Sequence, residues 1–287
     1  MRTQVAIVGA GPSGLLLGAL LGRAGIDAVV VEQRSADYVL GRIRAGVLEQ
    51  TTVELLEQAG VAGRLHREGL PHTGTELAFG GALHRIDFQA LTGKRVTVYG
   101  QTEVTQDLMR ARTEAGWASV YEAENVSVAG FDTDRPVVRW RQHGREHELA
   151  CDFSAGCDGY HGVCRTSVPS AAITTHEKVY PFGWLGLLAD VPPASEELVY
   201  ANHERGFALC SQRSRTRSRY YLQCSLEDEA GRWSDQAFWD ELRRRLPAEI
   251  AQPRHELVHR DVSADHHVMD ERQRQHDNPH INDRNEL

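Results

Sequence analysis

Two short apolar segments near the N-terminus have the pattern of strands that are buried on both faces. Val5–Val8 and Ala28–Val31 are runs of β-branched and small apolar residues with no polar alternation. Leu15–Ala24, between them, is mostly apolar and is followed by Gly25, which predicts a helix that ends at a glycine. A strand, a helix and a second strand in this order predict the first βαβ unit of a parallel sheet.

A different pattern occurs later in the chain, where apolar and polar residues alternate. Phe207–Arg213 and Arg217–Gln223 follow this period of two and are separated by a short polar segment, which predicts two strands joined by a turn. On a strand, Ser211, Arg213 and Arg215 would share one face. Such a face could bind a planar carboxylate, with arginine as a bidentate partner. The alternative is a basic sheet edge that opposes aggregation.

Composition and charge narrow the class of protein. Hydrophobic residues make up 41% of the chain and charged residues 25%, which is ordinary for a soluble globular protein. The 32 Lys and Arg against 40 Asp and Glu give a formal charge of -8, which argues against nucleic acid or an anionic membrane as a partner. The five cysteines include no C-x-x-C pair, so they predict neither a metal site nor a disulfide framework. We expect a cytoplasmic protein without a metal.

The turn after the first predicted strand has the spacing of a dinucleotide-binding loop. Gly9–Gly14 reads G-x-G-x-x-G: Gly9 permits the tight turn, Gly11 lets the backbone approach a pyrophosphate, and Gly14 lets the helix pack on the strand. Glu32, at the end of the second strand, can accept hydrogen bonds from a ribose hydroxyl and would repel a 2′-phosphate. The site should therefore hold FAD or NAD rather than NADP.

Two further clusters have more than one interpretation when they are taken alone. Gly41–Leu48 contains Arg42 and Arg44, which could bind phosphates or a flavin edge, or could form a solvated basic turn. Ala155–Gly162 follows a predicted strand at Glu148–Phe153 and is either a second cofactor contact or a plain loop.

Taken together, several segments resemble one family. The segments at 3–32, 38–50, 96–104, 155–162, 179–190 and 200–221 closely resemble the para-hydroxybenzoate hydroxylases, which are single-component FAD-dependent aromatic hydroxylases. The resemblance implies an α/β fold with a Rossmann-like FAD-binding domain at 1–70 and 97–178 and an interleaved, sheet-rich substrate domain at 71–96 and 179–252. It also implies hydroxylation of 4-hydroxybenzoate to 3,4-dihydroxybenzoate, with NAD(P)H and O₂ as co-substrates.

The resemblance also implies roles for individual residues. Tyr200 would hydrogen-bond the substrate's phenol and help remove its proton, and Arg219 would lie beside the mobile flavin ring. His72 would stand at the outer end of the family's proton-transfer network. From its own context, His72 would be an ordinary surface histidine. Four residues would complete the substrate site with Tyr200, namely Ser211, Gln212, Arg213 and Tyr221. The implied FAD contacts are Gly9, Gly11, Ser13, Gly14, Glu32, Arg42, Ile43, Arg44, Ala45, Gly46, Val47, Gln101, Asp158 and Gly159, and the implied nicotinamide contacts are His161 and Arg165.

The resemblance ends near Gln252. The segment 253–287 contains 6 of the 14 histidines and no Gly, Cys, Lys or aromatic residue, a composition that predicts an aberrant or disordered tail. We find no counterpart of the family's third flavin motif, or of the C-terminal helices that form much of its homodimer interface. An alternative therefore stays open, which is a catalytically inactive fragment that binds flavin or an aromatic acid weakly. A second alternative, an NAD-dependent dehydrogenase, would require Glu32 to hold NAD.

Overall fold

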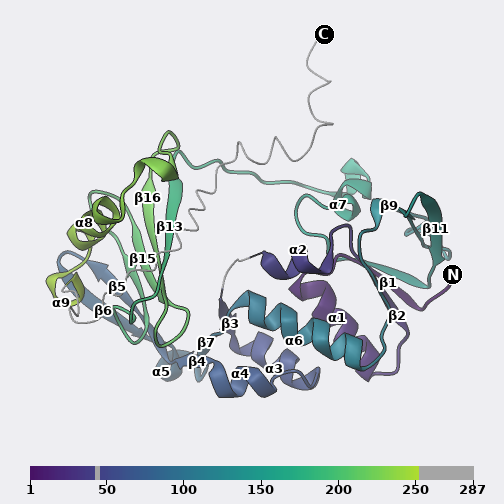
Figure 1. Cartoon of the computed structure of the whole chain (residues 1–287), viewed down its shortest axis with the longest axis horizontal. Coiled ribbons are helices and arrows are strands. Elements are labelled where there is room, and N and C mark those ends of the chain that lie inside the picture. The colour runs from purple at the N-terminus through teal and green to yellow at the C-terminus, as the bar shows by residue number, and fades with distance from the viewer. Residues whose placement is uncertain (43–45, 252–287) are drawn as a thin grey trace, which may run out of the picture. The chain divides into compact units, whose positions relative to one another are not determined.

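The computed structural model describes residues 1–42 and 46–251, and these form two compact units. Unit 1 comprises Met1–Gly69 and Tyr99–His176, and unit 2 comprises Leu70–Val98 and residues 177–251 of the described chain (Figure 1). The chain therefore enters unit 2 for one short excursion before it returns to complete unit 1. The predicted tail at 253–287 and the expected contacts Ile43, Arg44 and Ala45 lie outside the described residues.

Unit 1 contains the predicted βαβ start. Its elements are β1 (Val5–Val8), α1 (Pro12–Arg23), β2 (Ala28–Val31), α2 (Ala36–Gly41), β3 (Val47–Glu49), α3 (Gln50–Gln58), α4 (Gly63–Glu68), α6 (Gln101–Glu114), β8 (Ser119–Val120), β9 (Glu124–Ala129), β10 (Val137–Gln142), β11 (Arg145–Ala150), β12 (Phe153–Gly156), α7 (Val163–Ser167) and a 3₁₀ turn at Ser170–Ala172. Strands β12, β1, β2 and β8 form a parallel sheet in that order, which confirms the predicted α/β class.

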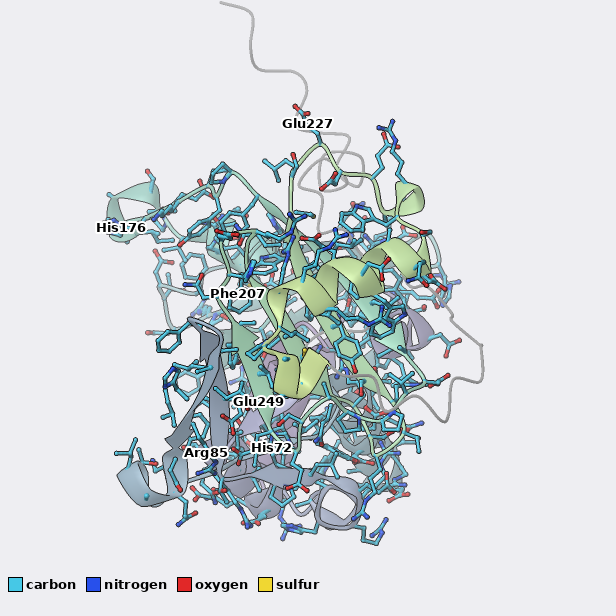
Figure 2. The ribbon with its side chains drawn as sticks, turned by 90° about the vertical axis from the view of Figure 1, so that its left-hand side faces the viewer. His72, Arg85, His176, Phe207, Glu227 and Glu249 are labelled. Carbon is cyan, nitrogen blue, oxygen red and sulfur yellow. The ribbon has the colours of Figure 1, made fainter. Side chains whose placement is uncertain are left out.

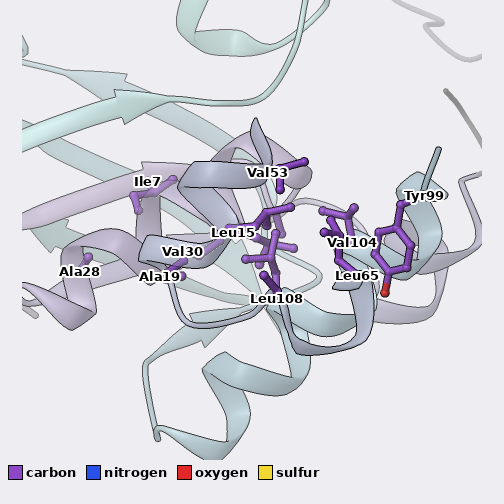
Figure 3. Packing of buried hydrophobic residues seen from close by; sticks show 14 residues of the cluster. Ile7, Leu15, Ala19, Ala28, Val30, Val53, Leu65, Tyr99, Val104 and Leu108 are labelled. Carbon is purple, nitrogen blue, oxygen red and sulfur yellow. The ribbon is translucent and has the colours of Figure 1, made fainter. Parts of the chain in front are cut away.

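Both faces of this parallel sheet are covered, which explains the continuous apolar runs in β1 and β2. On one face Ile7 and Val30 pack with Leu15 of α1 and Leu108 of α6 (Figure 3). On the other face, side chains of β1 and β2 pack with Trp140 and other residues of the antiparallel sheet β11–β10–β9. A strand with two buried faces has no polar positions, so its sequence shows no alternation.

Unit 2 is built around a mixed six-stranded sheet. Its elements are β4 (Leu70–His72), β5 (Gly74–Phe79), β6 (Ala82–Asp87), α5 (Phe88–Thr92), β7 (Val96–Val98), β13 (Gly183–Ala189), β14 (Leu198–Ala201), β15 (Ala208–Gln212), β16 (Ser218–Cys224), a 3₁₀ turn at Ala230–Arg232, α8 (Asp235–Arg245) and α9 (Ala248–Ala251). The strand order is β13–β16–β15–β14–β5–β6, and only β14 and β5 pair in parallel. Helix α8 buries Phe238 and Leu242 against one face of this sheet.

Two sequence predictions of secondary structure are wrong. The strand expected at Glu148–Phe153 is two strands, because β11 ends at Ala150 and β12 begins at Phe153. Residues 148–150 belong to the antiparallel sheet and Phe153 to the parallel sheet, so the segment has no single period. The helix expected from Leu15 begins three residues earlier at Pro12, where the ring has the backbone angle of a first helical position.

Candidate functional site

The glycine loop between β1 and α1 is shaped by close backbone packing at its ends and is open at its centre. Gly9 has φ +106°, and a Cβ there would lie 2.5 Å from the carbonyl oxygen of Cys157. A Cβ at Gly14 would overlap the carbonyl oxygen of Gly9. A Cβ at Gly11, by contrast, would meet no described atom within 4 Å. The fold therefore requires Gly9 and Gly14. The space beside Gly11 is open, so a pyrophosphate could approach the backbone there.

The start of α1 offers backbone donors to this space. Gly11 is the N-cap residue and has no side chain that could accept from the first-turn N–H groups, and Pro12 opens the helix. Glu32 fixes the loop from the other side: its Oε2 accepts the N–H of Ala10 at 2.7 Å, and its Oε1 accepts the N–H of Arg34 at 2.8 Å. A carboxylate has further lone pairs, so Glu32 can also accept a ribose hydroxyl. The arrangement fits a bound dinucleotide.

The expected contacts downstream of the loop lie on three other segments of unit 1. Arg42 donates from Nη1 to the Tyr38 hydroxyl at 3.2 Å, and its guanidinium lies 5.5 Å from the centre of that ring. Gly46 accepts the N–H of Tyr99 at 2.9 Å, just before Val47 begins β3. Gln101 is the first residue of α6 and is half-buried.

The Asp158-Gly159 segment is an ordered turn that leads into α7. The Oδ2 of Asp158 accepts the N–H of Cys164 at 2.9 Å, in the first turn of that helix. Arg165 donates from Nε to the Tyr160 carbonyl at 2.9 Å and lies 4.2 Å from the centre of that ring. His161 meets the same ring edge-on, with the ring centres 5.0 Å apart.

A pocket of about 700 Å³ in unit 1 brings several of these residues together. Its lining includes Ser13, Asp158, Gly159 and Arg165, which the sequence had singled out on two separate segments. His161 is not among the lining residues, although Arg165 is. The sequence did not indicate Phe131, which lines the pocket from the segment between β9 and β10.

In unit 2, three of the expected substrate residues share one face of the sheet with Arg219. Tyr200 on β14 pairs with Leu209, which pairs with Tyr221 on β16, and Ser211 pairs with Arg219. Paired residues lie on the same face, and so do residues two apart along a strand. Ser211 donates from Oγ to the Arg219 carbonyl at 3.1 Å, and the Arg219 guanidinium lies 4.7 Å from the centre of the Tyr221 ring. We call this set the tyrosine face.

The structure corrects the expected positions of Arg213 and Arg215. Strand β15 ends at Gln212, so both arginines lie in the turn before β16, where the alternation of a strand no longer applies. The turn is closed by the N–H of Arg213, which donates to the Arg217 carbonyl at 2.8 Å. Arg213 is half-buried and Arg215 is exposed. The prediction that Ser211, Arg213 and Arg215 share a strand face is therefore wrong. Arg213 is nevertheless only two residues from Ser211 in the chain.

His72 and Gln212 also differ from expectation. The His72 side chain is not at the surface, since it is only 2% exposed. Burial lowers its pKa, and a hydrogen bond with Gln212 and the charge of Glu197 oppose that change. Gln212 is buried on the face opposite to Ser211, because adjacent strand residues point to opposite sides.

Sequence reasoning missed an ion-pair network around a buried glutamate in unit 2. Glu241 on α8 accepts from Arg205 Nε at 2.9 Å and Nη2 at 2.8 Å, and from Arg245 Nε at 2.9 Å. The four-residue spacing of Glu241 and Arg245 is a signal that could have indicated their contact. Nothing in the sequence indicates Arg205, which comes from the segment between β14 and β15.

Two other findings concern only the described residues 1–42 and 46–251. No group of three or more His, Cys, Asp or Glu side chains has an arrangement that could hold a metal ion. No helix in this part of the chain is both long and apolar enough to cross a membrane.

Comparison with known proteins adds to the geometry. The sequence profile of a family described as "FAD binding domain" matches residues 2–278. The chain is 60% identical over 250 residues to p-hydroxybenzoate hydroxylase of Acinetobacter baylyi, an alignment that covers 87% of this chain and 62% of that protein. It is 46% identical over 193 residues to 3-(3-hydroxy-phenyl)propionate/3-hydroxycinnamic acid hydroxylase 2 of Burkholderia vietnamiensis, covering 64% of this chain and 34% of that protein. The chain thus spans less than two thirds of the length of either relative.

Among solved structures, PqsL of P. aeruginosa in complex with 2-aminobenzoylacetate is similar in fold. The two superpose with a TM-score of 0.73 at 21% sequence identity, and the match covers 88% of this chain and 69% of PqsL. At this level of identity the likeness concerns the fold alone.

Proposed function

The chain belongs to the FAD-binding domain family, and from this premise we propose that it is an FAD-dependent monooxygenase that hydroxylates 4-hydroxybenzoate to 3,4-dihydroxybenzoate. The observation that carries the proposal is the 60% identity with p-hydroxybenzoate hydroxylase over 250 residues, which is 87% of this chain. NAD(P)H would supply the electrons and O₂ the oxygen atom. The free state of all five cysteines supports a reducing, cytoplasmic location.

Unit 1 would hold the cofactor. Gly9, Gly11, Ser13 and Gly14 would receive the pyrophosphate at the start of α1, and Glu32 would accept from a ribose hydroxyl. Arg42, Gln101, Asp158 and Gly159 would make further contacts, and His161 and Arg165 would meet the nicotinamide nucleotide. When bound and reduced, FAD supplies the chemistry of oxygen activation. An NAD-dependent dehydrogenase would use the same loop but would leave the tyrosine face without a role.

Unit 2 would hold the substrate. The tyrosine face has a phenolic hydroxyl at Tyr200, which is 38% exposed and would hydrogen-bond the phenol of the substrate. Removing the phenol's proton increases the electron density of the ring and makes it a better nucleophile toward oxygen. The substrate's carboxylate would be bound by Arg213 together with Ser211 and Tyr221, since arginine binds a carboxylate through two parallel hydrogen bonds.

The direct test is the visible spectrum of the purified chain with FAD, before and after 4-hydroxybenzoate is added. We expect bound flavin whose absorption shifts with the ligand, and product that forms when NAD(P)H is supplied under air. Flavin binding and a ligand shift without product would instead support the alternative, a catalytically inactive fragment. A protein that retains no flavin would contradict the proposal for this chain.

Replacing Gly11 with Ala separates a cofactor role of the loop from a structural one. Gly11 has φ −67°, which alanine adopts readily, and the added methyl would point into open space. We expect unfolding of the flavin-free variant to match wild type, but its FAD affinity to fall at least tenfold, about 1.4 kcal/mol, because the methyl occupies the pyrophosphate's place. Flavin fluorescence titration measures the affinity. Gly14→Ala is the control and should destabilise the flavin-free protein itself. Unchanged FAD affinity in Gly11→Ala would show that the cofactor does not approach this loop.

A further inference from the structure

The side-chain amide of Gln212 has a fixed orientation. Its Nε2 lies 2.9 Å from the carbonyl oxygen of Ser195 and 2.8 Å from that of Glu196. Carbonyl oxygens can only accept, so the group that faces both of them must be the NH₂, which has two hydrogens to donate. The amide oxygen of Gln212 must therefore face the other way, and there it meets the ring of His72.

This orientation determines which ring nitrogen of His72 carries a hydrogen. The Nε2 of His72 lies 3.4 Å from the Gln212 Oε1, and both side chains are buried. An amide oxygen can only accept, so Nε2 must be an N–H donor in the neutral ring as well as in the charged one. The other nitrogen, Nδ1, is buried and has no hydrogen-bond partner among the described residues. In the neutral ring Nδ1 is thus a bare acceptor.

We propose that Gln212 is a positioning residue that holds His72 in the Nε2–H tautomer, so that the ring takes up and releases its proton at Nδ1. The inference rests on the proposed function, because the family resemblance places His72 at the outer end of the network that carries away the substrate's proton. It also changes the role expected for Gln212, whose amide is already engaged by Ser195, Glu196 and His72 and whose side chain lies on the face opposite to Ser211.

The surroundings of His72 are consistent with a ring that rests in its neutral form. Glu197 is the charged group whose field acts on the ring, and it is itself paired with Arg85 of β6, with the Arg85 Nε to Glu197 Oε2 distance at 2.9 Å. Arg85 also donates from Nη2 to the hydroxyl of Thr73, the residue after His72 in the chain, at 2.9 Å. Figure 2 labels Arg85 and His72. Because Arg85 neutralises much of the Glu197 charge, burial outweighs it and favours the neutral ring.

The tautomer can be measured directly in the wild-type protein. ¹⁵N NMR of the histidine rings across a pH titration distinguishes a protonated from a bare nitrogen at each position. We expect His72 to show one tautomer, with Nε2 protonated throughout and Nδ1 carrying the whole change on titration. His143, which is exposed in the turn between β10 and β11, serves as the reference and should show an average of two tautomers. A bare Nε2 or an averaged signal at His72 would overturn the proposal.

Two substitutions then test whether Gln212 is the cause. Gln212→Met removes both hydrogen-bonding groups at similar length, and the single-tautomer signal of His72 should be lost. Gln212→Glu places a carboxylate beside the Nε2–H and should raise the titration midpoint of His72 by roughly one pH unit or more.

If a folded Gln212→Met retained the single tautomer of His72, the tautomer would have a cause other than Gln212. Should a variant fail to fold, the wild-type titration still decides the tautomer. A correct tautomer in a chain that makes no hydroxylated product would refute the proposed function but not this inference.

Discussion

Replacing Arg213 with Ala is expected to weaken the binding of 4-hydroxybenzoate by roughly 2–5 kcal/mol, which corresponds to at least a thirtyfold rise in Kd. The physical reason is that the ligand's carboxylate would be removed from water on binding and would then lack its charged partner. Arg213 is half-buried in the turn after β15, two residues from Ser211 on the tyrosine face. Titration of the flavin spectrum with 4-hydroxybenzoate measures the Kd. Calorimetry on the same flavin-loaded protein measures this Kd without relying on the flavin signal.

A matched control is available in the same turn. Arg215 carries the same charge but is exposed, so Arg215→Ala should change the Kd less than threefold, well under 1 kcal/mol. Arg213→Lys keeps the charge but loses the planar pair of donors and should fall between the two. If Arg213→Ala and Arg215→Ala weakened binding equally, the effect would be a general electrostatic attraction and Arg213 would not be a carboxylate partner.

The parts of this molecule that could be predicted from the sequence are those determined by residues close together in the chain. The glycine loop is an example: the turn at Gly9, the helix after it and Glu32 at the end of β2 all follow from one thirty-residue segment. The hydrogen bond from Ala10 N–H to Glu32 is likewise local to the βαβ unit, although the close packing of Gly9 on Cys157 is not. Short-range geometry of this kind leaves few alternatives.

The parts that could not be predicted depend on where a strand ends or on which distant segment packs nearby. The predicted position of Arg213 on a strand face was wrong because β15 ends one residue earlier, at Gln212. That boundary is set by the turn and not by the residue pattern. The burial of His72 depends on Gln212, 140 residues further along the chain, and on Ser195 and Glu196, which orient that glutamine. A single sequence contains no signal for such a pairing.

The network around Glu241 is of the same long-range kind, and it connects α8 to the sheet of unit 2. Arg245 donates not only to Glu241 but also from Nη1 to the carbonyl oxygens of Phe207 at 3.0 Å and Gln223 at 2.8 Å. The side chains of Glu241 and Arg245 are 8% and 6% exposed. Burial alone would raise the pKa of Glu241, but the hydrogen bonds from Arg205 and Arg245 outweigh it and lower the pKa.

Replacing Glu241 with Ala should therefore be among the most destabilising single changes in unit 2. It leaves the Arg245 charge buried without its counter-ion, which costs about 3–5 kcal/mol and lowers the melting temperature by roughly 10 °C. Because the folded-state pKa of Glu241 lies below its ordinary value of 4.5, the network's contribution is present above that pH and is lost as the pH falls. The stability difference between wild type and Glu241→Ala, measured by denaturant unfolding at a series of pH values, should therefore narrow on acidification.

Glu204 is an exposed acid near the same arginines, so Glu204→Ala is the control and should change stability by less than about 0.5 kcal/mol. A difference that stayed constant with pH would mean that Glu241 stabilises the unit through packing rather than through its charge.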